Sequence, residues 1–341
     1  MTLRVGIAGA SGYTGVELIR LLVAHPQVEV VALSGGRAAG QPVAKSWPAL
    51  AGLGLPDLQP LSLELCAGLD VLFLALPHGV SAGFVGELVA AGQLARGLRV
   101  IDLGADFRLR DPAVHAAAYG AHPHPELLAQ AVYGLPERFR DQIRGAALIA
   151  NPGCYPTATA IAALPLVDAL GADWVVADCL SGVSGAGRSP GPRNLYCETT
   201  ERAVAYGVAG SHRHTPEIEQ LLGVPVTFTP HLAPMSRGML ATVHARVRRL
   251  PSAAELRALY DAAYADHPMV VVVDSPPSSG DVRGTARAHV AAFVDPARGV
   301  VTATCAIDNL GKGAAGQAVH NMNLACGLPE TAGLPLVPLL P

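Results

Sequence analysis

The segment LRVGIAGASGYTG, residues 3–15, predicts a buried strand that ends in a glycine-rich turn. Apolar side chains then recur at helical spacing through residues 16–24. A strand, a glycine turn and a helix in succession favour dinucleotide binding, because glycines let the backbone approach a pyrophosphate at the helix amino terminus. The spacing G-x-x-G-x-x-G holds one residue more than the usual G-x-G-x-x-G, and the alternative is an ordinary strand-to-helix turn. We predict cofactor contacts at Gly9, Ser11, Gly12, Tyr13, Thr14 and Gly15.

The next predicted strand, residues 28–33, indicates which nicotinamide cofactor is bound. In a dinucleotide fold this strand ends near the adenosine ribose, where an acidic residue binds the 2′-hydroxyl of NAD. Here the strand is followed by Ser34-Gly35-Gly36-Arg37. A hydroxyl and a guanidinium suit a 2′-phosphate, so we expect NADP(H), with Ser34 and Arg37 as contacts. Lys45 is a second candidate for this phosphate, and its alternative is a solvated surface lysine.

Further apolar segments alternate with helical ones in the first half of the chain. We predict strands at residues 70–76, 99–102 and 148–150. This alternation predicts a parallel, Rossmann-like doubly wound sheet of the α/β class, in which ligands gather at the carboxyl ends of the strands. His78, Arg108 and Cys154 all follow such ends. Arg108 can clamp a phosphate or carboxylate, and the alternative is a solvated loop arginine.

The second half of the chain is rich in strands and poor in helices. Strands are predicted at residues 174–180, 226–230, 238–248, 269–273, 287–294 and 301–307. A helix lies among them, where Ser252 and Glu255 form a capping box. This pattern predicts an α+β domain on a mixed or antiparallel sheet. We expect a cofactor domain at residues 1–150 and a catalytic and dimerisation domain at residues 151–311.

Residues 111–142 are rich in proline, histidine, alanine and tyrosine, and include His122-Pro123-His124-Pro125. Alternating histidines suggest metal binding, but no acidic or thiol partner is close in the sequence. Prolines hold such a segment extended. We therefore predict a surface loop here and no metal site.

Cys154 stands out from the other cysteines by its position in the segment LIANPGCYPT, residues 148–157. The segment predicts a strand end, a tight turn and a helix start, with Pro156 in the first helical turn. The helix amino terminus favours a thiolate, which is the nucleophilic form of cysteine. The alternative is an inert buried thiol. The six cysteines include no C-x-x-C pair, which argues against a disulfide framework or a thiolate zinc site.

Two loops of the second half add to this chemistry. The glycine-rich residues 181–188 allow close approach of a cofactor or substrate. In residues 211–218, Thr215 and Pro216 predict a helix cap and a first helical residue, with His212 and His214 directly ahead. Zinc usually needs three ligands, so one histidine as acid/base is the better interpretation. A thiolate, an imidazole and NADPH together suit reduction of an activated acyl group through a thioester.

Composition sets broad limits on the protein. The 341 residues suit two domains, and 50% hydrophobic with 15% charged residues argues against disorder. The net charge of -3 gives no sign of a nucleic-acid partner. We found no apolar run of about 18 residues and no signal peptide, so we expect a soluble cytoplasmic protein without a membrane partner.

The chain resembles the N-acetyl-gamma-glutamyl-phosphate reductase family of the aspartate-semialdehyde dehydrogenase superfamily, from Gly6 to about Glu330. The motifs that carry the resemblance are residues 9–15, 76–79, 105–108, 151–157, 181–188, 212–217 and 308–317. The resemblance implies NADPH-dependent reduction of N-acetyl-L-glutamyl 5-phosphate, a small acyl phosphate, to the 5-semialdehyde in arginine biosynthesis. It also implies a homo-oligomer, a dimer or tetramer, and a last helix at residues 312–330 that returns to the cofactor domain.

The resemblance also implies roles for individual residues. Cys154 carries over as the nucleophile and His212 as the acid/base, with Glu217 as its orienting carboxylate and His214 as the alternative to His212. Further cofactor contacts are expected at Pro77, Ser184, Gly185 and Asn309. Substrate contacts are expected at Arg108, Asn151, Arg188 and His214.

Three other functions are weighed against this one. A related lysine-pathway enzyme acts on a carrier-protein-linked aminoadipyl phosphate, and a basic rim would be expected for its acidic carrier. Aspartate-semialdehyde dehydrogenase fits the His-Arg-His-Thr-Pro-Glu motif less well. A catalytically silent NADP-binding sensor would need neither Cys154 nor His212.

Overall fold

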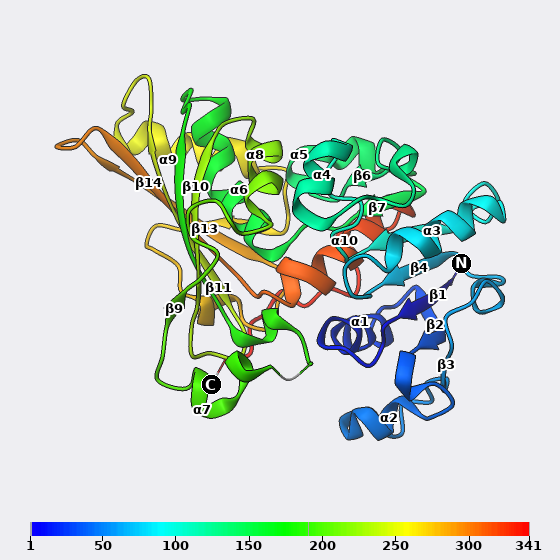
Figure 1. Ribbon diagram of the computed structural model, residues 1–341. Helices are drawn as coiled ribbons and strands as arrows, with labels where there is room; N and C mark the ends of the chain where they lie inside the picture. Colours follow the sequence, from blue (N-terminus) through cyan, green and yellow to red (C-terminus); the bar gives the residue numbers. More distant parts are fainter. Residues whose placement is uncertain (1, 190, 341) are drawn as a thin grey trace. The chain divides into compact units, whose positions relative to one another are not determined.

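The computed structural model describes residues 2–189 and 191–340 (Figure 1). The chain divides into two compact units. Unit 1 comprises Met1–Pro152 and Ala314–Leu334, and unit 2 comprises Gly153–Gly313 and Pro335–Pro341. The chain therefore passes from unit 1 to unit 2 between Pro152 and Gly153, next to Cys154, and returns directly after Gly313.

Unit 1 is built on a seven-stranded sheet in which every neighbouring pair is parallel. Its order is β3 (Leu58–Gln59), β2 (Val28–Ser34), β1 (Leu3–Ala8), β4 (Val71–Leu74), β5 (Arg99–Asp102), β7 (Leu148–Ala150) and β6 (Val132–Tyr133). The central strands are apolar on both faces, as parallel strands covered on both sides must be. The carboxyl ends of β1, β4, β5 and β7 lie at one edge, which is the ligand edge of such a sheet.

Helices lie on both faces of this sheet. The helices of unit 1 are α1 (Tyr13–Val23), α2 (Val43–Ser46), α3 (Ser81–Ala90), α4 (Pro112–Tyr119), α5 (Pro136–Ile143) and α10 (Gly316–Ala325). In Figure 1, α1 and α3 lie on opposite sides of the parallel strands. The α3 side chains of Phe84, Val85 and Leu88 join a core with Leu72 and Leu74 of β4. On the other face α10 packs against α1, α5 and β5.

The predicted surface loop at residues 111–142 is wrong, because this segment contains α4, β6 and α5. The Asp111 carboxylate accepts a hydrogen bond from the Ala113 backbone N–H and so caps α4. His115 and His122 are buried, with ring centroids 4.9 Å apart, and the His122 ring also packs on Phe107. Both histidine rings therefore belong to the packed interior of unit 1.

Unit 2 is built on a mixed seven-stranded sheet. Its order is β12 (Val270–Val272), β13 (Ala288–Asp295), β14 (Val300–Ile307), β11 (Met239–Arg246), β8 (Val175–Ser181), β10 (Val226–Leu232) and β9 (Val204–Ala205). The β8/β10 and β12/β13 pairs are parallel and the other pairs antiparallel. The predicted α/β class, with a Rossmann-like sheet and a second α+β part on a mixed sheet, is confirmed.

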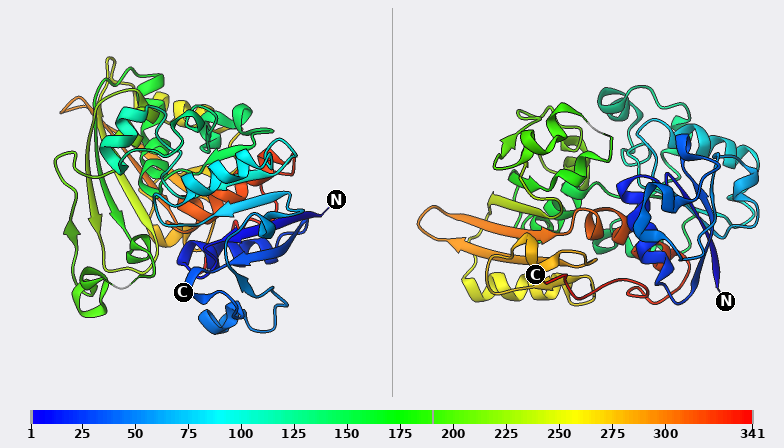
Figure 2. Two further views of the ribbon diagram at one scale, coloured as in Figure 1. Left: turned by 45° about the vertical axis from the view of Figure 1, so that its right-hand side comes forward. Right: turned by 90° about the horizontal axis from the view of Figure 1, so that it is seen from below.

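The helices of unit 2 are α6 (Cys154–Asp168), α7 (Tyr196–Thr199), α8 (Thr215–Leu222) and α9 (Ala253–Tyr264). The α6 helix packs against β11, β13 and β14. Figure 2 gives two further views of the strands and helices of both units. Pro165 lies inside α6 and lacks the N–H that would bond to the Ile161 carbonyl. The Tyr264 hydroxyl of α9 donates to that carbonyl instead, which satisfies it inside the core.

Two smaller findings complete the fold. The predicted Thr215 cap is wrong, because α8 begins at Thr215 itself, His214 is the residue before it, and the cap forms no side-chain hydrogen bond. A π-helical turn, Gly311–Ala315, precedes α10.

None of the helices within residues 2–189 and 191–340 has both the length and the apolar character needed to cross a membrane.

Candidate functional site

The glycine loop of unit 1 has the geometry of a phosphate-binding turn. Gly9 has φ +83°, and a Cβ there would lie 2.2 Å from the Ala75 carbonyl oxygen. A Cβ on Gly15 would lie 2.2 Å from the Gly9 carbonyl oxygen, so Gly15 lets α1 pack closely on the loop. At Gly12 the nearest atom to a Cβ is the Gly9 oxygen at 3.5 Å. The protein itself therefore requires glycine at 9 and 15, whereas Gly12 leaves room for an outside group.

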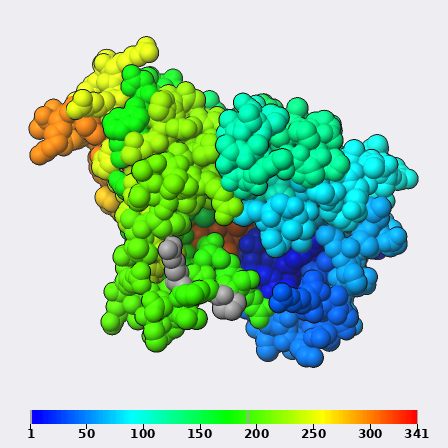
Figure 3. Space-filling model, in the orientation of Figure 1, coloured from blue at the N-terminus to red at the C-terminus, as the bar shows by residue number. Residues whose placement is uncertain are grey.

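The same loop is suited to an anion. The α1 helix begins at Tyr13, and its first turn holds no acidic residue, so the positive end of its dipole is unopposed by a side chain of that turn. Ser11, Gly12, Tyr13 and Thr14 are partly exposed. On the face drawn in Figure 3, atoms from the amino-terminal, dark blue end of the colour scale reach the surface. These residues fit a dinucleotide pyrophosphate.

At the end of β2 the two predicted 2′-phosphate contacts differ in exposure. Ser34 is buried, and its carbonyl accepts the Gly9 and Ala10 N–H groups at 3.0 and 2.8 Å. Arg37 is exposed in a short 3-10 turn, Gly36–Ala38. Sequence reasoning missed Trp47, whose indole N–H donates to the Ser11 carbonyl at 3.1 Å. No motif around Trp47 points to this contact across 36 residues of chain.

In unit 2, Cys154 is the first residue of α6, as the sequence predicts. Its N-cap residue is Gly153, and the cysteine is half-buried. A Cβ on Gly313 would lie 2.8 Å from the Cys154 Cβ, so a larger residue at 313 would collide with Cys154 in its present position. The helix amino terminus favours a thiolate at Cys154.

Glu217 is the carboxylate beside this helix terminus. It is 1% exposed, and its Oε1 accepts the Gly153 N–H at 3.0 Å. Its Oε2 lies 4.0 Å from the His214 Nε2. The family resemblance implies that Glu217 orients His212, whereas in the structure its carboxylate lies beside His214, because residues three apart at the start of α8 face the same side.

His212 is held as a neutral imidazole. The His214 backbone N–H donates to its Nδ1 at 3.0 Å, so the ring proton of the neutral form lies on Nε2. Burial, helped by the nearby Arg213 charge, lowers the pKa of His212 to about 4. The ring is packed edge-on among Tyr155, Tyr206 and Phe228, with centroids 5.3 to 5.6 Å away. Near neutral pH, His212 is therefore suited to donate a hydrogen bond from Nε2 and not to take a proton there.

Two residues that were predicted to contact the substrate form hydrogen bonds with the protein's own groups in this structure. Arg108 is buried, and its Nε and Nη2 each donate at 2.8 Å to the carbonyls of Asn151 and Leu103. The Asn151 Oδ1 accepts from the Asn321 Nδ2 at 3.0 Å, and its Nδ2 donates to the Ala314 carbonyl at 3.2 Å. Both side chains hold backbone around the turn before Cys154. Arg108 is therefore not the solvated loop arginine that was the alternative.

The predicted cofactor contacts of unit 2 form a joined group. The Asn309 Nδ2 donates to the Ser184 Oγ at 2.9 Å, and the Asn309 Oδ1 accepts the Gly238 N–H at 2.8 Å. The neighbouring Asp308 is fully buried and binds the Arg237 guanidinium, with Nε to Oδ2 at 2.9 Å. This network holds the base of the 181–188 loop. Gly185 and Arg188 are exposed farther along that loop, and Pro77 is exposed after β4 in unit 1.

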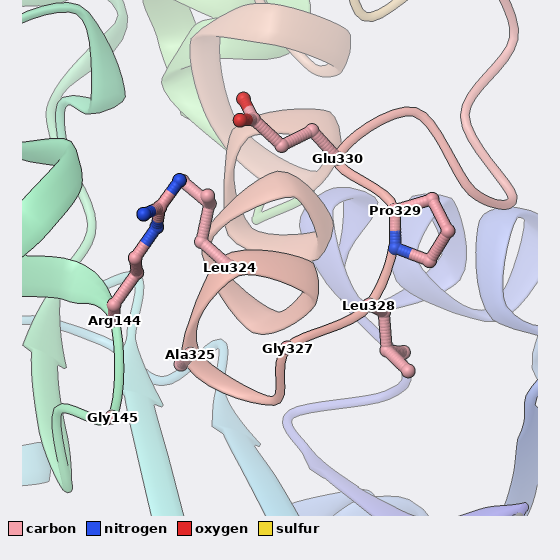
Figure 4. Close-up of a pocket in the computed structure, with 8 residues that line it drawn as sticks. All are labelled: Arg144, Gly145, Leu324, Ala325, Gly327, Leu328, Pro329 and Glu330. Carbon is pink, nitrogen blue, oxygen red and sulfur yellow. The ribbon is translucent and has the colours of Figure 1, made fainter.

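Unit 1 also contains a cavity of about 510 Å³ at the carboxyl end of α10 (Figure 4). It is lined by Arg144, Gly145, Leu324, Ala325, Gly327, Leu328, Pro329 and Glu330. None of these is a predicted site residue. The Glu330 carboxylate is bound by the His320 Nε2 at 2.9 Å and by the Arg140 Nη2 at 3.3 Å, which ties the segment after α10 in place.

Comparison with known proteins defines the class. The model for "Semialdehyde dehydrogenase, NAD binding domain" matches residues 4–146, and that for "Semialdehyde dehydrogenase, dimerisation domain" matches residues 154–309. Aspartate semialdehyde dehydrogenase II from Vibrio cholerae has the same fold, with a TM-score of 0.71 at 18% identity over 95% of this chain and 98% of that one. The Candida albicans enzyme with NADP gives 0.67 at 17%, over 95% and 98%. The protein is an oxidoreductase of the semialdehyde dehydrogenase class with a nicotinamide cofactor.

Curated relatives identify the particular family. N-acetyl-gamma-glutamyl-phosphate reductases from Geobacter sp. (strain M21) and Pseudomonas syringae pv. syringae are 46% and 48% identical. The alignments cover 99% of this chain and 100% and 99% of those proteins. The protein from Symbiobacterium thermophilum is 47% identical over 98% of both chains. The chain belongs to the N-acetyl-gamma-glutamyl-phosphate reductase family, so the predicted resemblance is confirmed.

Proposed function

We propose that the protein reduces N-acetyl-L-glutamyl 5-phosphate with NADPH to N-acetyl-L-glutamate 5-semialdehyde, NADP and phosphate, as a step of arginine biosynthesis. The observation that carries the proposal is Cys154 as the first residue of α6, with the Glu217 carboxylate on the Gly153 N–H and 4.0 Å from His214. Membership of the family supports the substrate, because the relatives are named for it.

The first step forms a bond between the Cys154 sulfur and the acyl carbon. A base takes the thiol proton, the thiolate attacks the carbonyl carbon, and the C–O bond to phosphate breaks with its electron pair on phosphate. The proton passes from the base to the departing phosphate. The product is a thioester on Cys154. Bound NADPH supplies the hydride that reduces the thioester carbon. The resulting alkoxide collapses, the C–S bond breaks, and the thiolate takes a proton from water.

We assign the proton transfer of the first step to His214, with Glu217 as its orienting carboxylate. The residues alone leave His212 and His214 open for this role, and the family resemblance favours His212. Two observations support His214 instead: the Glu217 Oε2 lies 4.0 Å from its Nε2, and the His212 Nδ1 already accepts a backbone N–H. In this assignment His212 stays neutral and donates a hydrogen bond from Nε2 to the negative oxygen of the reacting carbonyl.

NADP(H) is the cofactor that we propose. The loop from Gly9 to Gly15 holds the pyrophosphate, and the exposed Arg37 after β2 binds the 2′-phosphate, with Lys45 on α2 as an additional cation. Arg37→Ala should weaken NADPH binding far more than NADH binding. Fluorescence titration with both cofactors measures this, and equal losses would place the 2′-phosphate elsewhere.

The remaining site residues are proposals of the same kind. Pro77, Ser184, Gly185 and Asn309 contact the cofactor, and Arg188 contacts the substrate. Arg108 and Asn151 act on substrate only through the backbone that they hold. The match to a dimerisation domain supports a homo-oligomer, which we propose is a dimer or tetramer.

The test is a spectrophotometric assay of phosphate-dependent NADP reduction with N-acetylglutamate semialdehyde, beside the aspartate and carrier-linked aminoadipate analogues. We expect a kcat/KM at least a hundredfold higher for the acetylglutamate compound. A preference for the aspartate or the aminoadipate analogue would assign that compound as the substrate. Cofactor binding without turnover of any of the three would mean a silent sensor.

A further inference from the structure

Asn151 is hydrogen-bonded at every polar group it has. Its N–H donates to the Asp102 carbonyl at 2.8 Å, and its own carbonyl accepts the Arg108 Nε at 2.8 Å. Its side chain accepts from Asn321 at 3.0 Å and donates to the Ala314 carbonyl at 3.2 Å. The residue is fully buried. Its position, three residues before Cys154, is therefore determined from four directions.

Asn321, on α10, is the origin of a directed chain of hydrogen bonds. Its Nδ2 donates both to the Gly134 carbonyl at 2.8 Å and to the Asn151 Oδ1. Both acceptors are oxygens, so a flipped amide would set oxygen against oxygen, and the orientation is determined. The direction runs from Asn321 to Asn151 to Ala314.

The oxygen of the Asn321 side-chain amide has a different environment from its nitrogen. The Asn321 Oδ1 is buried and has no hydrogen-bond partner among the described residues. A buried unpaired carbonyl oxygen destabilises a fold, so the residue contributes through its two donated bonds. An apolar side chain of the same size would remove the unpaired oxygen but also both donors.

The hydrogen bonds of Asn321 and Asn151 reach two chain segments that lead to the surroundings of Cys154. Asn151 precedes Cys154 across the turn Asn151-Pro152-Gly153, where the chain leaves unit 1. Ala314 follows Gly313, whose added Cβ would lie 2.8 Å from the Cys154 Cβ. The bond from Asn151 to Ala314 thus ties together the two chain segments that lead to Cys154 and to its glycine neighbour.

We propose that Asn321 is a positioning residue for Cys154, acting through Asn151 on residues 151–153 and 313–314. The role of Cys154 as acyl carrier rests on the proposed function, but its placement by Asn321 does not. Loss of the Asn321 amide lets both segments shift. A displacement of about 1 Å at a nucleophile can lower a rate by up to a hundredfold.

The matched control is Asn323, which lies on the same helix and is equally buried. Its Nδ2 donates to the carbonyls of Glu330 and Ala332 at 3.1 and 2.9 Å, and its Oδ1 accepts from His25 at 3.0 Å. Asn323→Ala therefore removes three hydrogen bonds from α10, one more than Asn321→Ala removes, but none of them involves Asn151. The comparison separates loss of stability from loss of position.

The experiment compares Asn321→Ala with Asn323→Ala in a Cys197→Ser background, because Cys197 is an exposed thiol. Peptide mass spectrometry follows alkylation of Cys154 by iodoacetamide, and steady-state kinetics give kcat and KM. Asn321→Ala should lower both the alkylation rate and kcat about tenfold, with KM within twofold, whereas Asn323→Ala leaves all three unchanged. Alkylation that is unchanged or faster in Asn321→Ala, or equal effects in both variants, would overturn the proposal.

Two further variants cover other outcomes. If Asn321→Ala does not fold, Asn321→Asp keeps the shape and replaces the donor by an acceptor, and the same tenfold loss is expected. Adding Asn151→Ala to Asn321→Ala should cause little further loss, because one chain of bonds is already broken, and additive losses would contradict it. A Cys154→Ser variant that still turned over would refute the proposed function while leaving the alkylation result valid.

Discussion

Gly313→Ala tests the packing around Cys154, the proposed nucleophile. The added Cβ would lie 2.8 Å from the Cys154 Cβ, and 3.3 Å from both the Asp308 carbonyl oxygen and the Ile307 Cδ1. Ordinary contacts of this kind are 3.4–4 Å long, so one partner must move by about 0.6–1.2 Å. The other two contacts are also shorter than ordinary ones and restrict movement of residue 313, so we expect Cys154 to move. A shift of that size at a nucleophile lowers kcat by roughly ten- to a hundredfold.

The assay measures kcat, Cys154 alkylation and thermal unfolding in parallel. Overpacking should also lower the free energy of unfolding by about 1–3 kcal/mol. Gly83→Ala on α3 is the control, because a Cβ there meets nothing within 4 Å and a helix prefers alanine to glycine. That variant should be active and slightly more stable. A Gly313→Ala enzyme with kcat within twofold of the parent would refute the packing argument.

Three further predictions concern single side chains. Glu217→Gln keeps an acceptor for the Gly153 N–H but removes the carboxylate charge 4.0 Å from His214. We therefore expect kcat to fall about a hundredfold with the melting temperature nearly unchanged. A normal kcat would exclude His214 and Glu217 as the proton-transfer pair. Gly12→Ala should raise KM for NADPH at least tenfold without loss of stability, because the Cβ has space in the protein alone; an unchanged KM would move the pyrophosphate elsewhere. Burial and the nearby Asp106 raise the pKa of Asp102 from 3.8 to about 7. Since the unfolded chain loses this proton at lower pH, the free energy of unfolding of the parent should fall by about 4 kcal/mol relative to Asp102→Asn as pH rises from 4 to 8. Parallel plots of unfolding free energy against pH for the two proteins would contradict this.

The elements whose structure depends on residues adjacent in the sequence could be predicted from the sequence. The β1 strand, the glycine turn and α1 follow from one stretch of 21 residues. Cys154 at the start of α6 follows from the turn and proline beside it. The missed helices α4 and α5 lie in a segment whose histidines and prolines resemble those of a loop, although Asp111-Pro112 is a helix start. Burial of His115 and His122 against other rings could not be inferred from their spacing.

The roles of Arg108 and Asn151 depend on partners far away in sequence. Asn321 is 170 residues from Asn151, and no pattern in either segment indicates that they meet. The tautomer of neutral His212 depends on one backbone N–H two residues later, which side-chain identity does not specify. Residue types therefore suggested candidates for the site, and hydrogen-bond geometry then showed which of these side chains bind the protein's own backbone.

The central claim is that Cys154 carries the acyl group. The most direct measurement mixes the enzyme with N-acetyl-L-glutamyl 5-phosphate in the absence of NADPH, quenches in acid and analyses the peptides by mass spectrometry. We predict an N-acetylglutamyl adduct on the peptide that contains Cys154, which NADPH added before the quench removes and Cys154→Ser abolishes. Full turnover without this adduct, or an adduct on another residue, would contradict the account.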